Sequence, residues 1–130
     1  MMSVLENVSE YWFHNYYRVL VVKTGSSYLV SVDVYRKGWI WSIDDRECVC
    51  NGEYCLLYHR VSREELASID GLEDVIDRVV EAFIVGVKAR DRLETVNVRY
   101  RIEGSSPLKY SDIEKLFYAS WSLTKTNPPS

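Results

Sequence analysis

The first half of the chain carries the hydrophobic pattern of two neighbouring strands. Segment 17–24 holds four apolar residues in succession, which is typical of a central strand that is covered on both faces. Segment 28–36 alternates instead, with Val30, Val32 and Val34 on one face and mostly polar residues on the other. Because the turn-forming run Gly-Ser-Ser separates the two segments, the pattern predicts an antiparallel pair.

A second hairpin is predicted around Asn51-Gly52, because an Asn-Gly pair suits the two turn positions that need positive φ. Counting outward from this turn places Cys48 opposite Cys55. If the ladder continues without a bulge, Asp44 lies opposite His59. These pairings bring the chemically reactive side chains of the segment onto a single ribbon.

The hydrophobic period changes to that of helices after this ribbon. Ser62 and Glu65 form a capping-box pattern, which marks a helix start. Apolar residues then recur at i, i+3, i+4 and i+7 and predict a long core helix over 71–90. A second capping-box pattern, beginning at Ser111, predicts a C-terminal helix over 111–124.

Three further segments complete the predicted fold. Residues 3–15 place apolar side chains at helical spacing, which predicts a short N-terminal helix, whereas 39–43 and 93–103 read as strands. Together these elements predict an α+β fold: one antiparallel sheet of four to five strands packed against the long helix and the C-terminal helix. No linker composition divides the chain, so we expect one domain over 1–130 that ends in a flexible tail, 126–130.

The composition, 47% hydrophobic with a net charge of −3, is that of a soluble globular domain. No apolar run approaches the roughly 18 residues of a membrane span, and the first residues lack a secretory pattern, so we expect a cytoplasmic protein that does not enter a membrane. The sequence contains no glutamine and is 27% charged, which indicates a hyperthermophile-like source. Cytosolic disulfides are acceptable in such proteins.

The three cysteines allow three interpretations. A cross-strand disulfide between Cys48 and Cys55 ranks first, because directly opposed strand residues lie within the span of a disulfide. Free packed thiols rank second. A zinc site formed by Cys48, Cys50, Cys55 and His59 ranks third, because His59 lies about 13 Å along the strand from Cys55 at ~3.4 Å per residue.

The predicted pair of Asp44 and His59 could orient an imidazole as a general base. A catalytic site also needs a nucleophile and oxyanion donors, and no pattern in the chain supplies them. Phosphate-binding loops, nucleophile elbows and dinucleotide motifs are missing from the sequence. We therefore predict a non-enzymatic protein without a cofactor, and a small zinc-binding protein or hydrolase ranks last among the functions considered.

Aromatic residues make up 13% of the chain, and tyrosine, tryptophan and arginine are the residues that anchor protein interfaces. Arg99 and Arg101 project from the polar side of their predicted strand, close to the expected position of Tyr35. The candidate interaction residues are Tyr35, Trp39, Arg99 and Arg101. The sequence thus favours a protein-binding or adaptor domain whose partner is a protein and which forms a homodimer.

A nucleic-acid-binding module is the alternative function. Arginine beside exposed tyrosine on an open sheet can bind single-stranded nucleic acid. The overall acidity of the chain argues against strong binding of phosphates, since that affinity comes from a net basic surface. The basic residues that would carry this activity are Lys88, Arg90, Arg92, Arg99 and Arg101.

Overall fold

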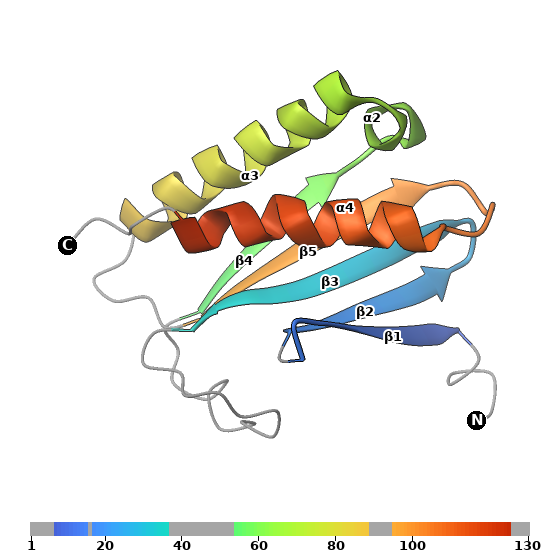
Figure 1. The fold of residues 1–130 in the computed structure, drawn as a ribbon, viewed down its shortest axis with the longest axis horizontal. Coiled ribbons are helices and arrows are strands. Elements are labelled where there is room, and N and C mark those ends of the chain that lie inside the picture. Colours follow the sequence, from blue (N-terminus) through green and yellow to red (C-terminus); the bar gives the residue numbers. More distant parts are fainter. Residues whose placement is uncertain (1–6, 16, 37–53, 89–94, 126–130) are drawn as a thin grey trace.

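A computed structural model describes residues 7–15, 17–36, 54–88 and 95–125 (Figure 1). Within these residues, five strands form one sheet in the order β1-β2-β3-β5-β4. The strands are β1 (Val8–Phe13), β2 (Tyr17–Thr24), β3 (Ser27–Arg36), β4 (Tyr54–Arg60) and β5 (Thr95–Glu103). The helices are α2 (Arg63–Ala67), α3 (Ile69–Lys88) and α4 (Tyr110–Trp121), and the short 3-10 helix η2 (Ser122–Lys125) follows α4.

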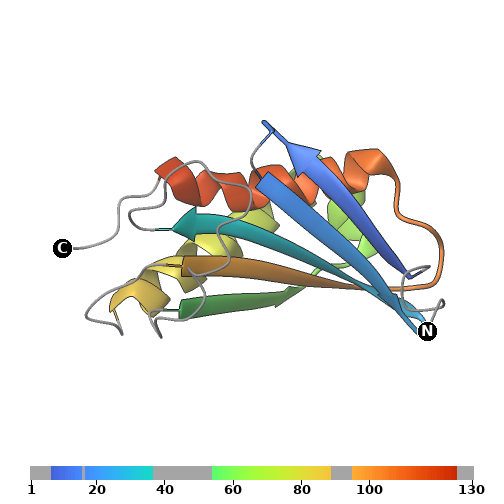
Figure 2. The ribbon, with the colours of Figure 1, turned by 90° about the horizontal axis from the view of Figure 1, so that it is seen from below.

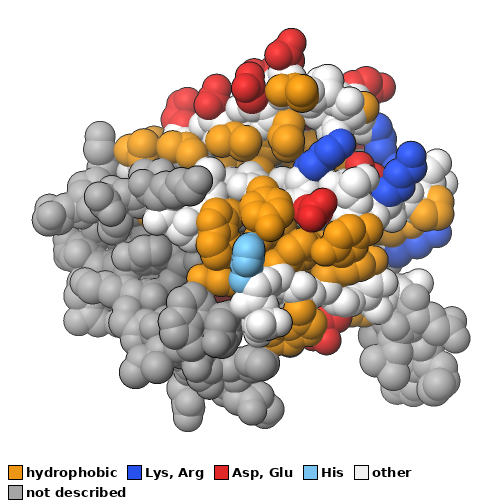
Figure 3. Space-filling model, viewed as in Figure 1, with side chains coloured by type: hydrophobic (Ala, Val, Ile, Leu, Met, Phe, Trp, Pro, Cys, Tyr) orange, Lys and Arg blue, Asp and Glu red, His pale blue; other side chains and the backbone are white. Residues whose placement is uncertain are grey.

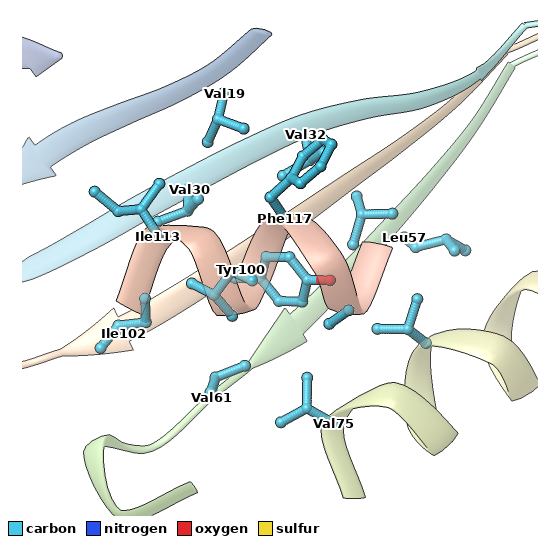
Figure 4. Packing of buried hydrophobic residues seen from close by; sticks show 14 of the residues in the cluster. Val19, Val30, Val32, Leu57, Val61, Val75, Tyr100, Ile102, Ile113 and Phe117 are labelled. Atoms are coloured by element: carbon cyan, nitrogen blue, oxygen red, sulfur yellow. The ribbon is translucent and has the colours of Figure 1, made fainter. Parts of the chain in front are cut away.

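The long helices α3 and α4 lie on the same face of the sheet (Figures 1 and 2). Figure 4 shows Val30 and Tyr100 of the strands close to Ile113 and Phe117 of α4, and all four side chains are buried. The residues of α3 that are fully buried in this core are Val75, Val79 and Phe83. Their helical spacing is the one seen in the sequence, so the predicted α+β class and the helix-covered sheet are confirmed.

The sheet is mixed and not wholly antiparallel as predicted. β1, β2, β3 and β5 pair antiparallel, but β4 runs parallel to β5. The cause is the connection between these two strands, which consists of α2 and α3. A helical crossover carries the chain back to the end of the sheet where β4 began, and two strands joined in this way run in the same direction.

Residues 3–15 do not form the predicted N-terminal helix, because their described part contains strand β1. Tyr11 and Phe13 turn toward the helices, while Val8 and Trp12 lie on the opposite face, which is the period of a strand. The aromatic run at 11–13 has high β propensity, and β2 offers it a hairpin partner. Pairing with β2 overrides the weak helical spacing of this segment.

β2 is an interior strand of the sheet, but it is covered on one face only. Val19 and Val21 are buried beneath the helices. Leu20 and Val22 point the other way and are half-buried, on a face where the described part of the chain places no helix. No described helix covers the second face of β2, because residues 8–13, predicted as part of a helix, form strand β1. Coverage of that face by another subunit stays a prediction.

The helix starts follow their capping residues. The Ser62 hydroxyl accepts the Glu65 amide at 3.0 Å and the Glu65 carboxylate accepts the Ser62 amide at 2.9 Å, so the predicted capping box is confirmed. A second serine, Ser68, accepts the Gly71 amide at 2.9 Å and allows α3 to begin at Ile69. The long helix thus spans 69–88 and not the predicted 71–90.

The C-terminal helix begins one residue before its predicted start. The Asp112 carboxylate accepts the backbone amide of Lys109 at 3.0 Å, so the helix follows Lys109 and not Ser111. The helix α4 ends at Trp121, and the 3-10 turn of η2 continues to Lys125 where 111–124 was predicted as one helix. The predicted strand 39–43, the Asn51-Gly52 turn and the tail 126–130 lie outside the described residues.

Candidate interaction surface on the open face of the sheet

The face of the sheet opposite the helices, here called the open face, carries its side chains in three rows that follow the strand register. The first row joins Val8, Val22 and Leu29. Arg101 and Arg60 complete it on β5 and β4. Because Cα partners on neighbouring strands are close and side chains alternate between faces, these five residues form one continuous band across the sheet.

The other two rows mix apolar, polar and charged residues. The second row runs from Glu10 of β1 to Tyr58 of β4, and the third from Trp12 of β1 to Leu56 of β4. The residues of the second row are Glu10, Leu20, Ser31, Arg99 and Tyr58. The register places Trp12 and Arg18, and then Asp33, Asn97 and Leu56, in the third row.

Among the large apolar and aromatic side chains of this face, exposure is greatest at the two edges. Trp12 on β1 is 40% exposed, and Leu56 and Tyr58 on β4 are 40% and 46% exposed. Leu20 and Leu29 between them are only half-buried. Large apolar and aromatic side chains that remain accessible on one continuous face are the usual mark of an interaction surface.

The arginines of the open face are largely neutralised by acidic neighbours. Arg18 lies 3.4 Å from the Glu10 carboxylate, and Arg101 lies 2.9 Å from the carboxylate of Glu103. Arg60 reaches the same Glu103 oxygen at 3.9 Å. The hydrogen bond with Glu103 also raises the pKa of the Arg101 guanidinium above its ordinary value.

Arg99 differs from these three arginines. It sits in the middle row between Ser31 and Tyr58, and within the part of the chain that the structure describes it makes no ion pair. Exposed ion pairs contribute little to stability, so the pairs around it act chiefly by reducing the net positive charge of the face. The face as a whole is amphipathic and only weakly basic.

The structure places the predicted interaction residues unevenly. Arg99 and Arg101 lie on the open face, since the residues that alternate with them are buried beneath the helices. Tyr35 pairs with Val96, after a bulge in β3, and lies four positions along the strand from Ser31, the partner of Arg99. It is therefore not beside Arg99 as expected. Trp39 lies outside the described residues.

The predicted basic set is only partly described. Lys88 is the last residue of α3, at the opposite side of the core from the open face. Arg90 and Arg92 fall in 89–94, outside the described residues. Arg99 and Arg101 are thus the members of this set that the structure places on one surface.

The cysteine, zinc and Asp44–His59 hypotheses depend on residues outside the described part of the chain. Cys48, Cys50 and Asp44 all fall in 37–53. Cys55 pairs with Val96 through its backbone in β4. The residues that the structure does describe contain no cluster of three or more metal-ligating side chains. The disulfide, the zinc site and the general base remain predictions.

His59 is described, and it lies on the helix-covered side of β4. Its ring centroid is 6.3 Å from that of Tyr100, and its Nε2 atom is buried without a hydrogen-bond partner among the described residues. Burial lowers the pKa of this imidazole, and the positive charge of Arg78 on α3 lowers it further. The ring is therefore neutral near pH 7 in the folded protein.

This neutral histidine predicts a loss of stability in mild acid. The folded protein binds the His59 proton less tightly than the unfolded chain, so His59 stabilises the fold above its ordinary pKa of 6.5 and stops doing so as the pH falls below it. Chemical unfolding at about pH 7 and about pH 5 should give a smaller free energy of unfolding at the lower pH. The variant His59→Gln should show a smaller difference, and an unchanged difference would contradict the assignment.

A second group of aromatic residues lies on the helix side, where α4 crosses the β1–β2 hairpin. Phe13 stacks on Phe117 with ring centroids 4.3 Å apart, and His14 lies 4.9 Å from the ring of Trp121. The Tyr118 hydroxyl lies 3.3 Å from Nε2 of His14. Figure 3 shows hydrophobic side chains gathered on this helix side of the molecule. Much of the aromatic content therefore serves packing.

None of the helices that the structure describes combines the length and hydrophobicity needed to cross a membrane. The open face is the candidate functional surface, because it carries large exposed side chains on one continuous sheet face. Comparisons with protein-family models, with curated proteins and with solved structures find no match for this chain.

Proposed function

We propose that this chain is a non-enzymatic protein-binding or adaptor module that also associates with copies of itself. The open face binds a protein partner. The observation that carries this proposal is the exposure of Trp12, Leu56 and Tyr58 on a sheet face that no described helix covers. Half-buried apolar residues surrounded by aromatic and arginine side chains are the usual composition of a protein interface.

The charge distribution supports a protein partner over a polyanion. Glu10 and Glu103 already contact three of the four arginines on this face. The chain as a whole has a net charge of −3. A surface that binds phosphates strongly needs an excess of uncompensated positive charge, whereas a protein partner can replace or bridge such ion pairs.

The proposal predicts that polar substitutions on the open face abolish partner binding. The double variant Leu56→Ser/Tyr58→Ser removes two large exposed side chains from β4. Its matched control is Ile69→Ser/Val85→Ser, which removes two exposed apolar side chains from α3. Quantitative affinity capture from cells of the source organism should recover the same partner with the wild type and the control, and at least about tenfold less with the open-face variant. Equal recovery with all three proteins would contradict the proposal.

Single-stranded nucleic acid is the second candidate ligand, and one observation favours it. Arg99 and Arg101 both flank Tyr58 on an open sheet, and Arg99 makes no ion pair with the described residues. Fluorescence anisotropy with labelled single-stranded RNA at low salt tests this alternative. Binding that weakens with salt and is lost in Arg99→Ala/Arg101→Ala would favour nucleic acid, and flat titrations would leave the protein partner as the ligand.

A further inference from the structure

Strand β1 lies at one edge of the sheet, and its outer side pairs with no strand among the described residues. The amide of Lys23 donates to the Asn7 carbonyl at 2.9 Å, which fixes the alternation of the β1–β2 ladder. In an antiparallel ladder, residues alternate between pointing their backbone groups toward a neighbouring strand and away from it. The N–H and C=O groups of Val8, Glu10 and Trp12 therefore point outward along this edge.

The side chains of this edge do nothing to block a further strand. Natural edges are usually protected by proline, lysine or an inward-pointing charge. Here the sequence VSEYWF contains one charged residue, Glu10, whose carboxylate is already engaged by Arg18 at 3.4 Å. Val8 and Trp12 are 37% and 40% exposed on the open face.

The helix side of the same edge is also apolar. The ring of Tyr11 lies 5.9 Å from that of Tyr110, and Tyr110 is 54% exposed. Phe13 lies 5.9 Å from Tyr110 as well, so the three rings continue the core outward to the edge. A strand added here would pair its backbone with β1 and would bury apolar side chains on both faces at once.

We propose that two copies of this chain associate through antiparallel pairing of their β1 strands about a two-fold axis. This inference rests on the proposed self-association and names its surface. With Glu10 opposite the partner's Glu10, Val8 lies beside the partner's Trp12, and Tyr11 lies opposite the small side chain of the partner's Ser9. The outward groups of three residues on each strand then form about six main-chain hydrogen bonds.

Side-chain size favours the second copy over an unrelated strand, because the two-fold register sets each Tyr11 opposite a small Ser9. The two glutamates that meet at the axis would repel each other, but each brings its own arginine through the Glu10–Arg18 contact. The four groups are together neutral and are arranged symmetrically. The pairing extends the sheet and leaves both open faces free for partners.

Proline at position 10 tests this pairing selectively. The Glu10 amide points away from β2, so Glu10→Pro removes an edge donor and adds bulk there without breaking a hydrogen bond of the β1–β2 ladder. Glu10→Thr is the matched control, because it also lacks the carboxylate but keeps the amide. Sedimentation velocity over a range of concentrations should show a dimer for the wild type and Glu10→Thr, and at least about tenfold weaker association for Glu10→Pro.

Amide hydrogen exchange followed by NMR provides a second measurement on the unmodified protein. The amides of Val8, Glu10 and Trp12 should become protected as the protein concentration rises. A wild type that stays monomeric overturns both the pairing and the proposed self-association. If the dimer persists in Glu10→Pro and these amides still exchange freely, the β1 pairing alone is overturned. Neither result bears on binding of a partner at the open face.

Discussion

Replacing Gly71 with alanine is expected to lower the free energy of unfolding by about 3 kcal/mol, the upper part of the usual range for overpacking. A Cβ atom at this position would lie 2.5 Å from the Cα atom of Glu65 and 2.7 Å from its carbonyl oxygen. Both are backbone atoms, so the clash cannot be relieved by a rotamer change. The helices α2 and α3 must move apart, which also strains the 2.7 Å contact between Glu65 and Arg78.

Urea unfolding of Gly71→Ala and of the double variant Ser68→Ala/Gly71→Ala shows whether the clash comes from the Glu65 backbone or from the Ser68 hydroxyl. The Ser68 hydroxyl would also meet the new methyl group, at 2.8 Å. Removing it should recover little stability, because the closest atoms belong to the Glu65 backbone, and Ser68→Ala alone should cost about 1 kcal/mol as a lost cap. A Gly71→Ala protein within about 0.5 kcal/mol of the wild type would show that the two helices are not held at this distance.

Phe117→Ala is expected to have the second large effect, a loss of about 3–5 kcal/mol. The ring is fully buried and stacks on Phe13 at an interplanar angle of 8°. Its centroid also lies 5.3 Å from that of Trp121 and 6.0 Å from that of Tyr17. The substitution therefore leaves a cavity between α4 and the β1–β2 hairpin that neither element can fill alone.

The neighbouring residue in the same helix supplies the control for this prediction. Tyr118 is 44% exposed, and its hydroxyl contacts His14 at the surface. Tyr118→Ala should cost no more than about 1.5 kcal/mol, because it removes a surface contact and creates no buried cavity. Similar losses for Phe117→Ala and Tyr118→Ala in thermal and urea unfolding would contradict the packing described for α4.

Local patterns in the sequence predict the helices and the interior strands well. The stripe that contains Val75, Val79 and Phe83 recurs along the long helix, and the alternation of β5 places Val98 and Tyr100 beneath the helices. Such long periodic segments leave one energetically sensible orientation, since any other would expose a row of apolar side chains.

The elements that the sequence mispredicts are those decided by distant partners. Segment 8–13 carries both the helical and the strand period of apolar residues, each weakly. Pairing with β2 selects the strand. The direction of β4 depends on the helical crossover that follows it, which local alternation does not encode. Register shifts are equally hidden: the bulge after Asp33 moves Tyr35 opposite Val96, and no residue in the sequence marks it.

The candidate surface was only partly predictable for the same reason. Arg99 and Arg101 stand out because they interrupt an apolar strand, so their outward direction follows from alternation alone. Trp12 falls in the segment 3–15, whose spacing predicts a helix. The alternation of Leu56 and Tyr58 with buried Leu57 is the signal that could have identified the edge of the face on β4.

Site-specific photo-cross-linking tests the open face as a protein-binding surface most directly. Benzoylphenylalanine replaces Tyr58, which is 46% exposed on the open face, or Val85, which is 63% exposed on α3. After illumination of cells of the source organism, the probe at position 58 should form a discrete covalent adduct with one protein, and the probe at position 85 should form none. No adduct at position 58, or the same adducts from both positions, would contradict binding through the open face.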